Sequence, residues 1–304
     1  MLQNEKAYLS AFVYSLIIGF SFMFTKLALA IASPMDTLAH RFTISFLIAS
    51  IPFLAKKAQL NMNYKDLIAI LPLAILYPTL FFTFQAFGLV YISSSEAGII
   101  QAVVPLFTVF LAGHFLNEYP TTQQKIFILL SVMGVIYIFV MKSSGLEVAN
   151  LQGALLILLS ALSAACYNVL ARNLTKRYAL YKLTYIMTMI GFITFNVIAI
   201  IQHNIDHTLS YFFVPFGNKE FLLSIFYLGI LSSLGTSFLS NYALSKLEAS
   251  KMSVFSNLAT LITIIAGVLV LHEKLQYFHL IGGSLILIGV IGTNYFNTKK
   301  VVNQ

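Results

Sequence analysis

The sequence predicts an all-α integral membrane protein with ten transmembrane helices that form two inverted five-helix repeats. Three observations predict this fold class: the composition, a succession of long apolar runs, and a likeness between the two halves of the chain. Of the 304 residues, 59% are hydrophobic and only 9% are charged, whereas a soluble domain carries about 25% charged residues. This composition excludes an ordinary soluble enzyme.

The first half contains five apolar runs of the length that crosses a bilayer, which is about 20 residues. They cover residues 7–31, 35–54, 66–89, 94–116 and 123–141. Polar or proline-containing stretches separate them, at Ser33-Pro34, Lys56-Lys57, Ser93-Ser94-Ser95 and 117–122. Pro78 is expected to kink the third helix. The first run is longer than a signal-peptide core and contains Lys26, so we expect it to remain in the chain as a helix.

The second half repeats this pattern with five further apolar runs. They cover residues 151–172, 183–201, 221–243, 249–271 and 278–296. Lys176-Arg177 follows the first of these runs, whereas the runs on either side of Leu247 nearly touch. We therefore expect two domains of five helices each, 7–141 and 151–296.

The distribution of Lys and Arg predicts how these helices are oriented. Ten spans with a cytoplasmic N-terminus leave only five of the 18 Lys and Arg residues outside, namely Lys26, Arg41, Lys142, Lys219 and Lys274. Positive residues concentrate on the cytoplasmic side, so we expect both termini in the cytoplasm and a multi-pass protein of the inner (cell) membrane. The formal net charge of +8 then reflects orientation, and no nucleic-acid partner is expected.

The two halves share equivalent residues. A shift of 155 positions places Ser95 on Ser250, Thr108 on Thr263 and Glu118 on Glu273, and a shift of 146 places Lys26 on Arg172. Because each half has an odd number of spans, the second half must enter the membrane in the opposite direction. Inverted repeats of this kind place the substrate site of many transporters near the bilayer midplane.

Several runs of residues resemble the repeat of a known family. In the first half they are the run from Gly19 to Lys26, then Pro34 and Arg41-Phe42, and in the second half Leu234-Gly235-Thr236, Asn241 to Leu244, Glu248-Ala249-Ser250, Gly267-Val268 and His272-Glu273. These runs resemble the EamA-type repeat of the drug/metabolite transporter (DMT) superfamily. The resemblance implies export or exchange of small metabolites, often amino acids, by alternating access.

Polar and aromatic side chains inside the expected spans are candidates for substrate binding, because polar groups within a bilayer usually face a partner helix or a wet cavity. Amides offer both donors and acceptors to an amino-acid-like zwitterion or a sugar, and aromatic rings can stack on a solute. The candidates are Phe22, Tyr77, Phe81, Gln85, Gln101, Asn168, Asn241, Ser256 and Asn257. The alternative is interhelical packing, since small residues and buried amides also hold membrane helices together.

Charged residues near the ends of the expected spans are candidates for a vestibule or a gate. Lys26 and Arg41 either form an electropositive outer vestibule that attracts carboxylates, or reach the interface and pair with Asp36. Glu118 and Glu273 are expected to accept amide hydrogen bonds at the start of the following helix, with gating as the alternative.

The position of the acidic residues predicts the energy coupling. They cluster at the ends of the expected spans, and Glu96, at the start of the fourth span, is the best remaining proton acceptor. Carriers that couple tightly to protons usually place an ionisable relay deep in the bilayer. We therefore expect facilitated diffusion or exchange of solute rather than proton-driven transport.

The sequence shows no pattern of an enzyme. Cys166 is the single cysteine, and neither a phosphate-binding loop nor a metalloprotease motif is present. His203, Asp206 and His207 fall in the longest outer loop, where solvated side chains are expected rather than a metal site. We expect no cofactor and no metal. The expected partners are a small-molecule solute and the lipid bilayer, and the sequence is compatible with a monomer. The rival classes are an intramembrane enzyme and a non-transporting scaffold or receptor.

Overall fold

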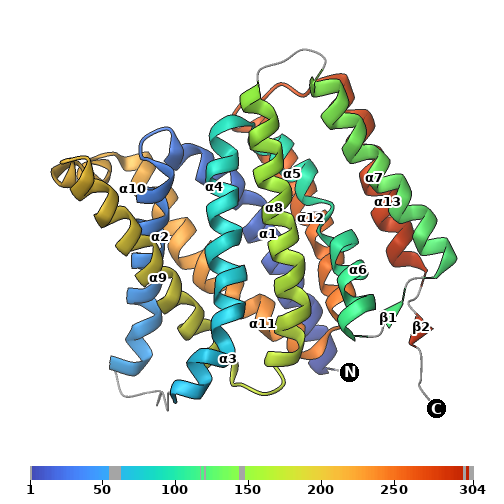
Figure 1. Cartoon of the computed structure of the whole chain (residues 1–304), viewed down its shortest axis with the longest axis horizontal. Coiled ribbons are helices and arrows are strands. Elements are labelled where there is room, and N and C mark those ends of the chain that lie inside the picture. The colour runs from blue at the N-terminus through green and yellow to red at the C-terminus, as the bar shows by residue number, and fades with distance from the viewer. Residues whose placement is uncertain are drawn as a thin grey trace.

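The computed structural model describes residues 2–54, 63–116, 118–119, 121–143, 148–296 and 299–300. These residues are almost entirely helical. Two strands of two residues, β1 (Glu118–Tyr119) and β2 (Lys299–Lys300), pair antiparallel. The chain is therefore a helical bundle in which one short strand pair joins the C-terminal end to the middle of the chain (Figure 1).

The helices of each half follow the apolar runs of the sequence, with ends that differ by a few residues. The first half forms α1 (Leu2–Leu29), α2 (Pro34–Leu54), α3 (Tyr64–Ala74), η1 (Ile75–Leu80), α4 (Phe81–Tyr91), α5 (Ser94–Gln101), α6 (Val104–Leu116) and α7 (Thr122–Ser143). The second half forms α8 (Val148–Leu174), α9 (Leu180–Ile205), η2 (Leu209–Tyr211), η3 (Val214–Gly217), α10 (Lys219–Phe226), η4 (Tyr227–Gly235), α11 (Thr236–Lys246), α12 (Ala249–Leu269) and α13 (Tyr277–Tyr295).

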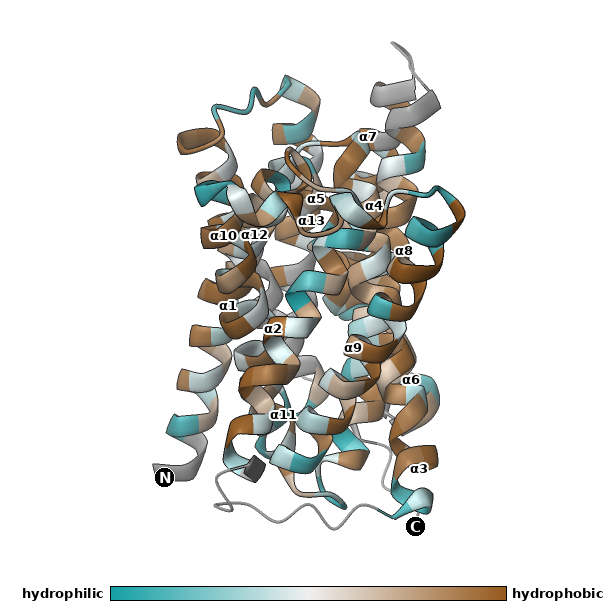
Figure 2. Cartoon of the chain, turned by 90° about the vertical axis from the view of Figure 1, so that its left-hand side faces the viewer, coloured by the Kyte–Doolittle hydropathy of each residue, from teal (hydrophilic) through white to brown (hydrophobic). Residues whose placement is uncertain are grey.

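Six helical segments are long and apolar enough to cross a membrane. They are Glu5–Leu29, Tyr64–Tyr91, Ser94–Phe115, Leu151–Leu174, Leu180–Ile205 and Lys219–Lys246. Three shorter apolar helices cover Thr122–Ile138, Leu258–Leu269 and Tyr277–Gly289. The protein is thus a multi-span membrane protein. Brown, hydrophobic residues cover most of the length of its helices, and teal residues gather mainly toward the two ends of the bundle (Figure 2).

Two of these segments are interrupted by π-helical turns at equivalent places. In the first half, η1 separates α3 from α4, and Tyr77 within it leaves the helical conformation at φ −145° and ψ 115°. Pro78 follows it and has no N–H to donate to the preceding turn, so the kink expected at this proline is present. In the second half, η4 separates α10 from α11. The 155-residue shift places η1 on the last part of η4.

Helices of one half pack against helices of the other half, and the contacts are equivalent in the two directions. Helix α2 packs on α9 and α7 on α13, while α1 packs on α11 and α12 as α8 packs on α4, α5 and α6. The chain begins at the lower end of Figure 1, whereas α8 begins at the upper end, so α1 and α8 run in opposite directions. Equivalent helices therefore occupy equivalent places with reversed direction.

One pair of hydrogen bonds also follows the repeat. Lys26 Nζ donates to Leu89 O at 2.5 Å, and Arg172 donates through Nη1 to Leu244 O at 2.7 Å. Lys26 and Arg172 are equivalent under the shift of 146, and Leu89 and Leu244 under the shift of 155. In both halves a cation on the first helix of the repeat thus binds the end of the interrupted third segment.

Candidate functional site: a central cavity between the two halves

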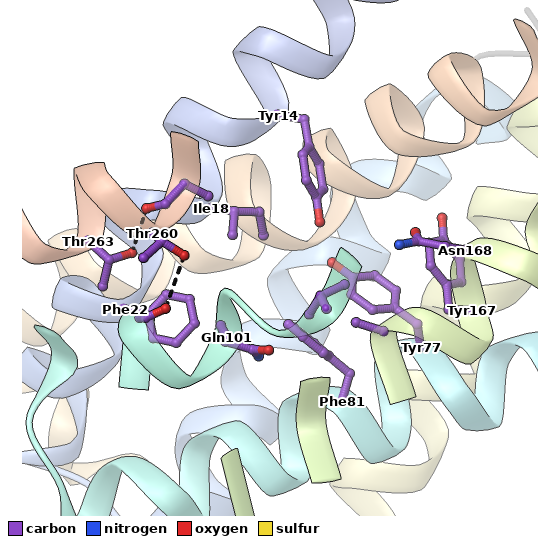
Figure 3. A pocket seen from close by; sticks show the side chains of 14 residues that line it. Tyr14, Ile18, Phe22, Tyr77, Phe81, Gln101, Tyr167, Asn168, Thr260 and Thr263 are labelled. Atoms are coloured by element: carbon purple, nitrogen blue, oxygen red, sulfur yellow. Dashed lines mark hydrogen bonds between the residues drawn. The ribbon is translucent and has the colours of Figure 1, made fainter. Parts of the chain in front are cut away.

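A cavity lies in the centre of the bundle, between helices of both halves. The space between its lining residues is about 510 Å³ when the solvent open to it is included. The first half contributes Tyr14, Ile18, Phe22, Tyr77, Phe81, Gly98, Gln101 and Val104, and the second half contributes Ala164, Tyr167, Asn168, Ala259, Thr260 and Thr263. Because α1 contributes three residues from its middle turns, the cavity lies midway between the ends of that helix (Figure 3).

Aromatic rings form much of the cavity wall. The ring centroid of Tyr77 lies 4.9 Å from that of Phe81 and 4.8 Å from that of Tyr167, with which it stacks. Figure 3 shows Phe22 toward one end of the cavity and Tyr14 and Tyr77 toward the other. The break at Tyr77 positions this side chain, because it turns the chain away from the helical path four residues before Phe81. Such a wall offers flat apolar faces to a bound solute.

Two amides supply polar groups to the cavity. Gln101 Nε2 donates to Ser160 Oγ at 3.1 Å, and Ser160 Oγ donates in turn to Phe81 O at 3.0 Å. Gln101 Oε1 is buried and has no hydrogen-bond partner within the described part of the chain. Asn168, 8% exposed, lies toward the other end of the cavity. The cavity therefore presents an acceptor that the protein does not satisfy and a second amide separated from it by aromatic rings.

Two threonines hold α12 against the first half at the edge of the cavity. Thr260 Oγ1 donates to Gly98 O at 3.0 Å (Figure 3), and Thr263 Oγ1 donates to Gly19 O at 2.9 Å. A Cβ at Gly98 would lie 2.8 Å from Thr263 Cγ2. The absence of a side chain at Gly98 thus permits the close approach that lets α12 line the cavity.

The structure brings together five of the nine substrate-binding candidates, which are Phe22, Tyr77, Phe81, Gln101 and Asn168. Their role in binding stays a prediction.

Sequence reasoning missed the tyrosines Tyr14 and Tyr167, which also line the cavity. Tyr14, Ile18 and Phe22 recur every fourth residue on α1. That spacing was a usable signal for one helix face. Tyr167 directly precedes the candidate Asn168, but no comparable spacing of residues distinguishes it in the sequence.

Two other candidates lie outside the cavity lining. Both amide atoms of Gln85, which is 1% exposed, lack a hydrogen-bond partner within the described residues. Asn241 Oδ1 accepts from the Tyr167 hydroxyl at 2.9 Å, and Asn241 Nδ2 donates to Thr184 Oγ1 at 3.2 Å. Asn241 therefore supports a lining tyrosine from behind. The side chains of the candidates Ser256, Asn257 and Glu118 fall outside the described part of the structure.

The expectation that Arg41 belongs to an outer vestibule is wrong. Arg41 is 1% exposed, and it donates through Nε to Ser233 Oγ at 2.6 Å and through Nη2 to Ser232 Oγ at 2.8 Å. Its guanidinium carbon lies 3.8 Å from the ring centroid of Phe82. Helix α2 packs on η4, and this contact turns the arginine toward the interrupted helix of the other half and away from water.

Lys26 and Glu273 lie beside each other at one end of the bundle, where both line an open pocket. Lys26 Nζ donates to Leu89 O and to Ile92 O, the latter at 2.9 Å. Glu273 accepts from Ser94 N at 2.7 Å, from Ser95 N at 2.8 Å and from Ser95 Oγ at 2.6 Å. The expected capping role is thus corrected, because Glu273 caps α5 of the first half and not the helix that follows it.

Two further acidic residues pair with histidines. Asp36 Oδ1 lies 2.8 Å from His203 Nε2, so Asp36 is paired with this histidine, in place of the expected pairing with Lys26 or Arg41. Glu96 Oε1 lies 3.3 Å from His279 Nε2, and both residues are buried. Within the described residues, no group of three His, Cys, Asp or Glu side chains is arranged to hold a metal ion.

The repeated fold and the cavity between its halves define a class of protein: multi-span membrane proteins built from two repeats with a cavity at the repeat interface. The chain belongs to the EamA-like transporter family, whose model matches residues 5–140 and 151–295. This membership bears out the resemblance to the drug/metabolite transporter superfamily.

Relatives of the chain carry transporter names. It is 55% identical over 298 residues to the uncharacterized transporter YcxC of Bacillus subtilis (strain 168), an alignment that covers 98% of this chain and 96% of the relative. It is 29% identical over 279 residues to an uncharacterized transporter of Archaeoglobus fulgidus, covering 90% and 92%. A solved structure titled "Crystal structure of protein" matches with a TM-score of 0.64 at 16% identity over 95% of this chain and 96% of that one, which supports the fold.

Proposed function

We propose that the protein is a secondary transporter of the inner membrane that exports or exchanges amino acids or related small metabolites by alternating access. The observation that carries this proposal is the central cavity, to which both halves contribute aromatic and amide side chains. A rocking motion of one half against the other can expose a site at such an interface to each side in turn. In this proposal the protein is a carrier and not an enzyme.

The proposal includes a ten-span topology with both termini in the cytoplasm. It adds α2, α7, α12 and α13 to the six long apolar segments and assigns five spans to each domain, 7–141 and 151–296. The packing supports this count. Helix α2 packs on its equivalent α9, which is one of the six long segments, and α7 packs on its equivalent α13. A helix that pairs with an equivalent membrane span is expected to cross the bilayer with it.

The proposed transport is facilitated diffusion or exchange, so flux follows the gradient of the solute. The fourteen residues that line the cavity, all of them described, include no carboxylate or histidine that could carry a proton with the solute. The buried pair of Glu96 and His279 lies outside this lining. We therefore propose that a pH gradient is not required for transport.

Counterflow in proteoliposomes tests the proposed function. Vesicles loaded with a panel of unlabelled amino acids and related metabolites are diluted into trace labelled solute at equal pH on both sides. Transient accumulation of label in vesicles with protein, absent from protein-free vesicles, is the expected result. A panel that gives no counterflow with folded protein favours the rival scaffold or receptor, and chemical conversion of the label favours an intramembrane enzyme.

A further inference from the structure

The chemistry of the cavity lining narrows the class of solute. None of the fourteen described lining residues is Lys, Arg, His, Asp or Glu. The wall consists of aromatic rings, small aliphatic side chains, hydroxyls and the amides of Gln101 and Asn168. Among these described residues, a full charge on a solute would therefore face only neutral dipoles.

Lys26 and Arg172, each four positions after a lining residue, and the buried Arg41 are bound elsewhere. Arg41 is held by two serine hydroxyls and the ring of Phe82, while Lys26 and Arg172 donate to the backbone oxygens at the ends of α4 and α11. None of the three lines the cavity. A carboxylate in the cavity would thus find no ionised partner among the described lining residues.

Burial decides which solutes such a site can hold. An ionised carboxylate or ammonium is costly to take out of water unless it is paired and hydrogen-bonded. A neutral polar group costs much less to bury and can offset this cost with one hydrogen bond. Gln101 Oε1, buried and without a partner in the described chain, is placed to accept such a bond from an N–H or O–H group. An uncharged donor satisfies this oxygen without bringing an unpaired charge.

We propose that the cavity binds solutes that carry no ionised group and that contain a flat ring, with an N–H or O–H donor for Gln101 and a polar group for Asn168. The ring lies against the aromatic wall of Phe22, Tyr77 and Phe81. This inference rests on the proposed function, in which the cavity is the transport site. It narrows the proposed substrates to metabolites related to amino acids but without ionised groups.

A matched set of probes tests the inference on the purified full chain. Benzamide, benzoate and benzamidine share one size and shape but are neutral, anionic and cationic, and phenylalanine supplies a zwitterion with the same ring. Binding is measured as the ligand-dependent rise in the unfolding temperature in detergent, which follows ligand concentration relative to Kd. We expect benzamide to bind at least about tenfold more tightly than the other three, a difference of about 1.4 kcal/mol.

Charge placed inside the cavity should reverse this preference. Asn168→Asp adds a carboxylate of nearly the same shape, so benzamidine should bind it more tightly than benzamide does. Gln101→Glu also replaces an amide by a carboxylate, toward the other end of the cavity. It serves as the second variant if Asn168→Asp does not fold. The matched control is Asn196→Asp on α9, because Asn196 binds Thr43 Oγ1 and Phe192 O outside the cavity. This control should keep the preference for benzamide.

The outcomes separate this inference from the proposed function. Equal or tighter binding of benzoate or phenylalanine overturns the inference, and counterflow of those solutes would still leave the protein a transporter. Binding of none of the probes together with counterflow of a charged metabolite overturns it as well. If benzamide binds selectively but no metabolite gives counterflow, the inference holds and the proposed function fails.

Discussion

Single side chains show what the sequence can predict about a site inside a membrane protein. Gln101 and Asn168 were identifiable because amides are costly in a bilayer and need a partner. The same argument selected Asn241, yet its Oδ1 accepts from the hydroxyl of Tyr167 behind the cavity wall. Chemistry alone therefore predicts that an amide is buried in protein. Which helix face it occupies depends on packing between segments far apart in the chain.

The amides of the first half should differ in their effect on transport. Gln101→Leu removes the unsatisfied acceptor of the cavity, and Gln85→Met removes an amide that lies outside the lining. We expect counterflow to fall at least about tenfold in Gln101→Leu, equivalent to about 1.4 kcal/mol, and to change little in Gln85→Met. Because burying an unsatisfied amide costs about 1–3 kcal/mol, Gln85→Met should also not lower the unfolding temperature. Equal loss of flux in both variants would place Gln85 on the solute path.

The serine partners of Arg41 should matter for stability. Ser233→Ala removes the acceptor of Arg41 Nε and leaves a buried donor on a charged group unpaired, at an expected cost of about 1.5–3 kcal/mol. The control is Ser284→Ala, because the exposed Ser284 donates only to Leu280 O of its own helix. Denaturant unfolding in mild detergent should show a loss for Ser233→Ala alone. Similar stability of the two variants would mean that the hydrogen bond from Arg41 to Ser233 does not stabilise the fold.

The helices were predictable, but their interruptions only in part. Pro78 marks the break in the third segment, since proline cannot continue the hydrogen-bond ladder. The equivalent π-helical turn η4 contains no proline, and it accompanies the contact of Ser232 and Ser233 with Arg41 of the other half. A break that goes with a tertiary contact leaves no local mark in the sequence. The repeat would have predicted it, once Tyr77 was known to leave the helix.

The cap on α5 joins the two halves and should stabilise the bundle. Glu273→Gln replaces one accepting oxygen by an NH₂ group that cannot accept from Ser94 N or Ser95 N. We expect this variant to lose about 1.5–3 kcal/mol of unfolding free energy, as for other hydrogen bonds to charged groups. Glu220→Gln is the control, because Glu220 is an exposed acid in the first turn of α10, where a charge contributes about 0.3–1 kcal/mol. Equal losses would mean that Glu273 does no more than a surface charge.

At the scale of the whole molecule, the repeat was the most informative feature of the sequence. The likeness of the halves and their odd number of spans predicted reversed directions, and α1 and α8 run in opposite directions in the structure. Lys26 and Arg172 are equivalent positions of the repeat, and they also form equivalent hydrogen bonds, with Leu89 O and Leu244 O respectively. The charge count predicts a separate property, namely which end of the bundle faces the cytoplasm.

Labelling of single cysteines tests the orientation. In a Cys166→Ser background, Lys219→Cys at the start of α10 and Lys176→Cys in the α8–α9 connection place thiols at exposed positions at opposite ends of the bundle. An impermeant maleimide added to intact cells should label Lys219→Cys only, because the positive-inside rule places Lys176 in the cytoplasm. Labelling of Lys176→Cys alone would reverse the proposed topology.

Access to the cavity tests the central claim that both halves share one alternating solute path. In the same background, Ala164→Cys places a thiol on the cavity wall, and Ala161→Cys, fully buried in an apolar cluster one turn away, is the control. A small impermeant methanethiosulfonate reagent is applied to right-side-out and to inverted vesicles, with and without a solute that gives counterflow. Alternating access predicts that Ala164→Cys reacts from both sides, more slowly when solute is present, and that Ala161→Cys reacts from neither. Reaction of Ala164→Cys from one side only, under conditions where solute flux proceeds, would contradict the account.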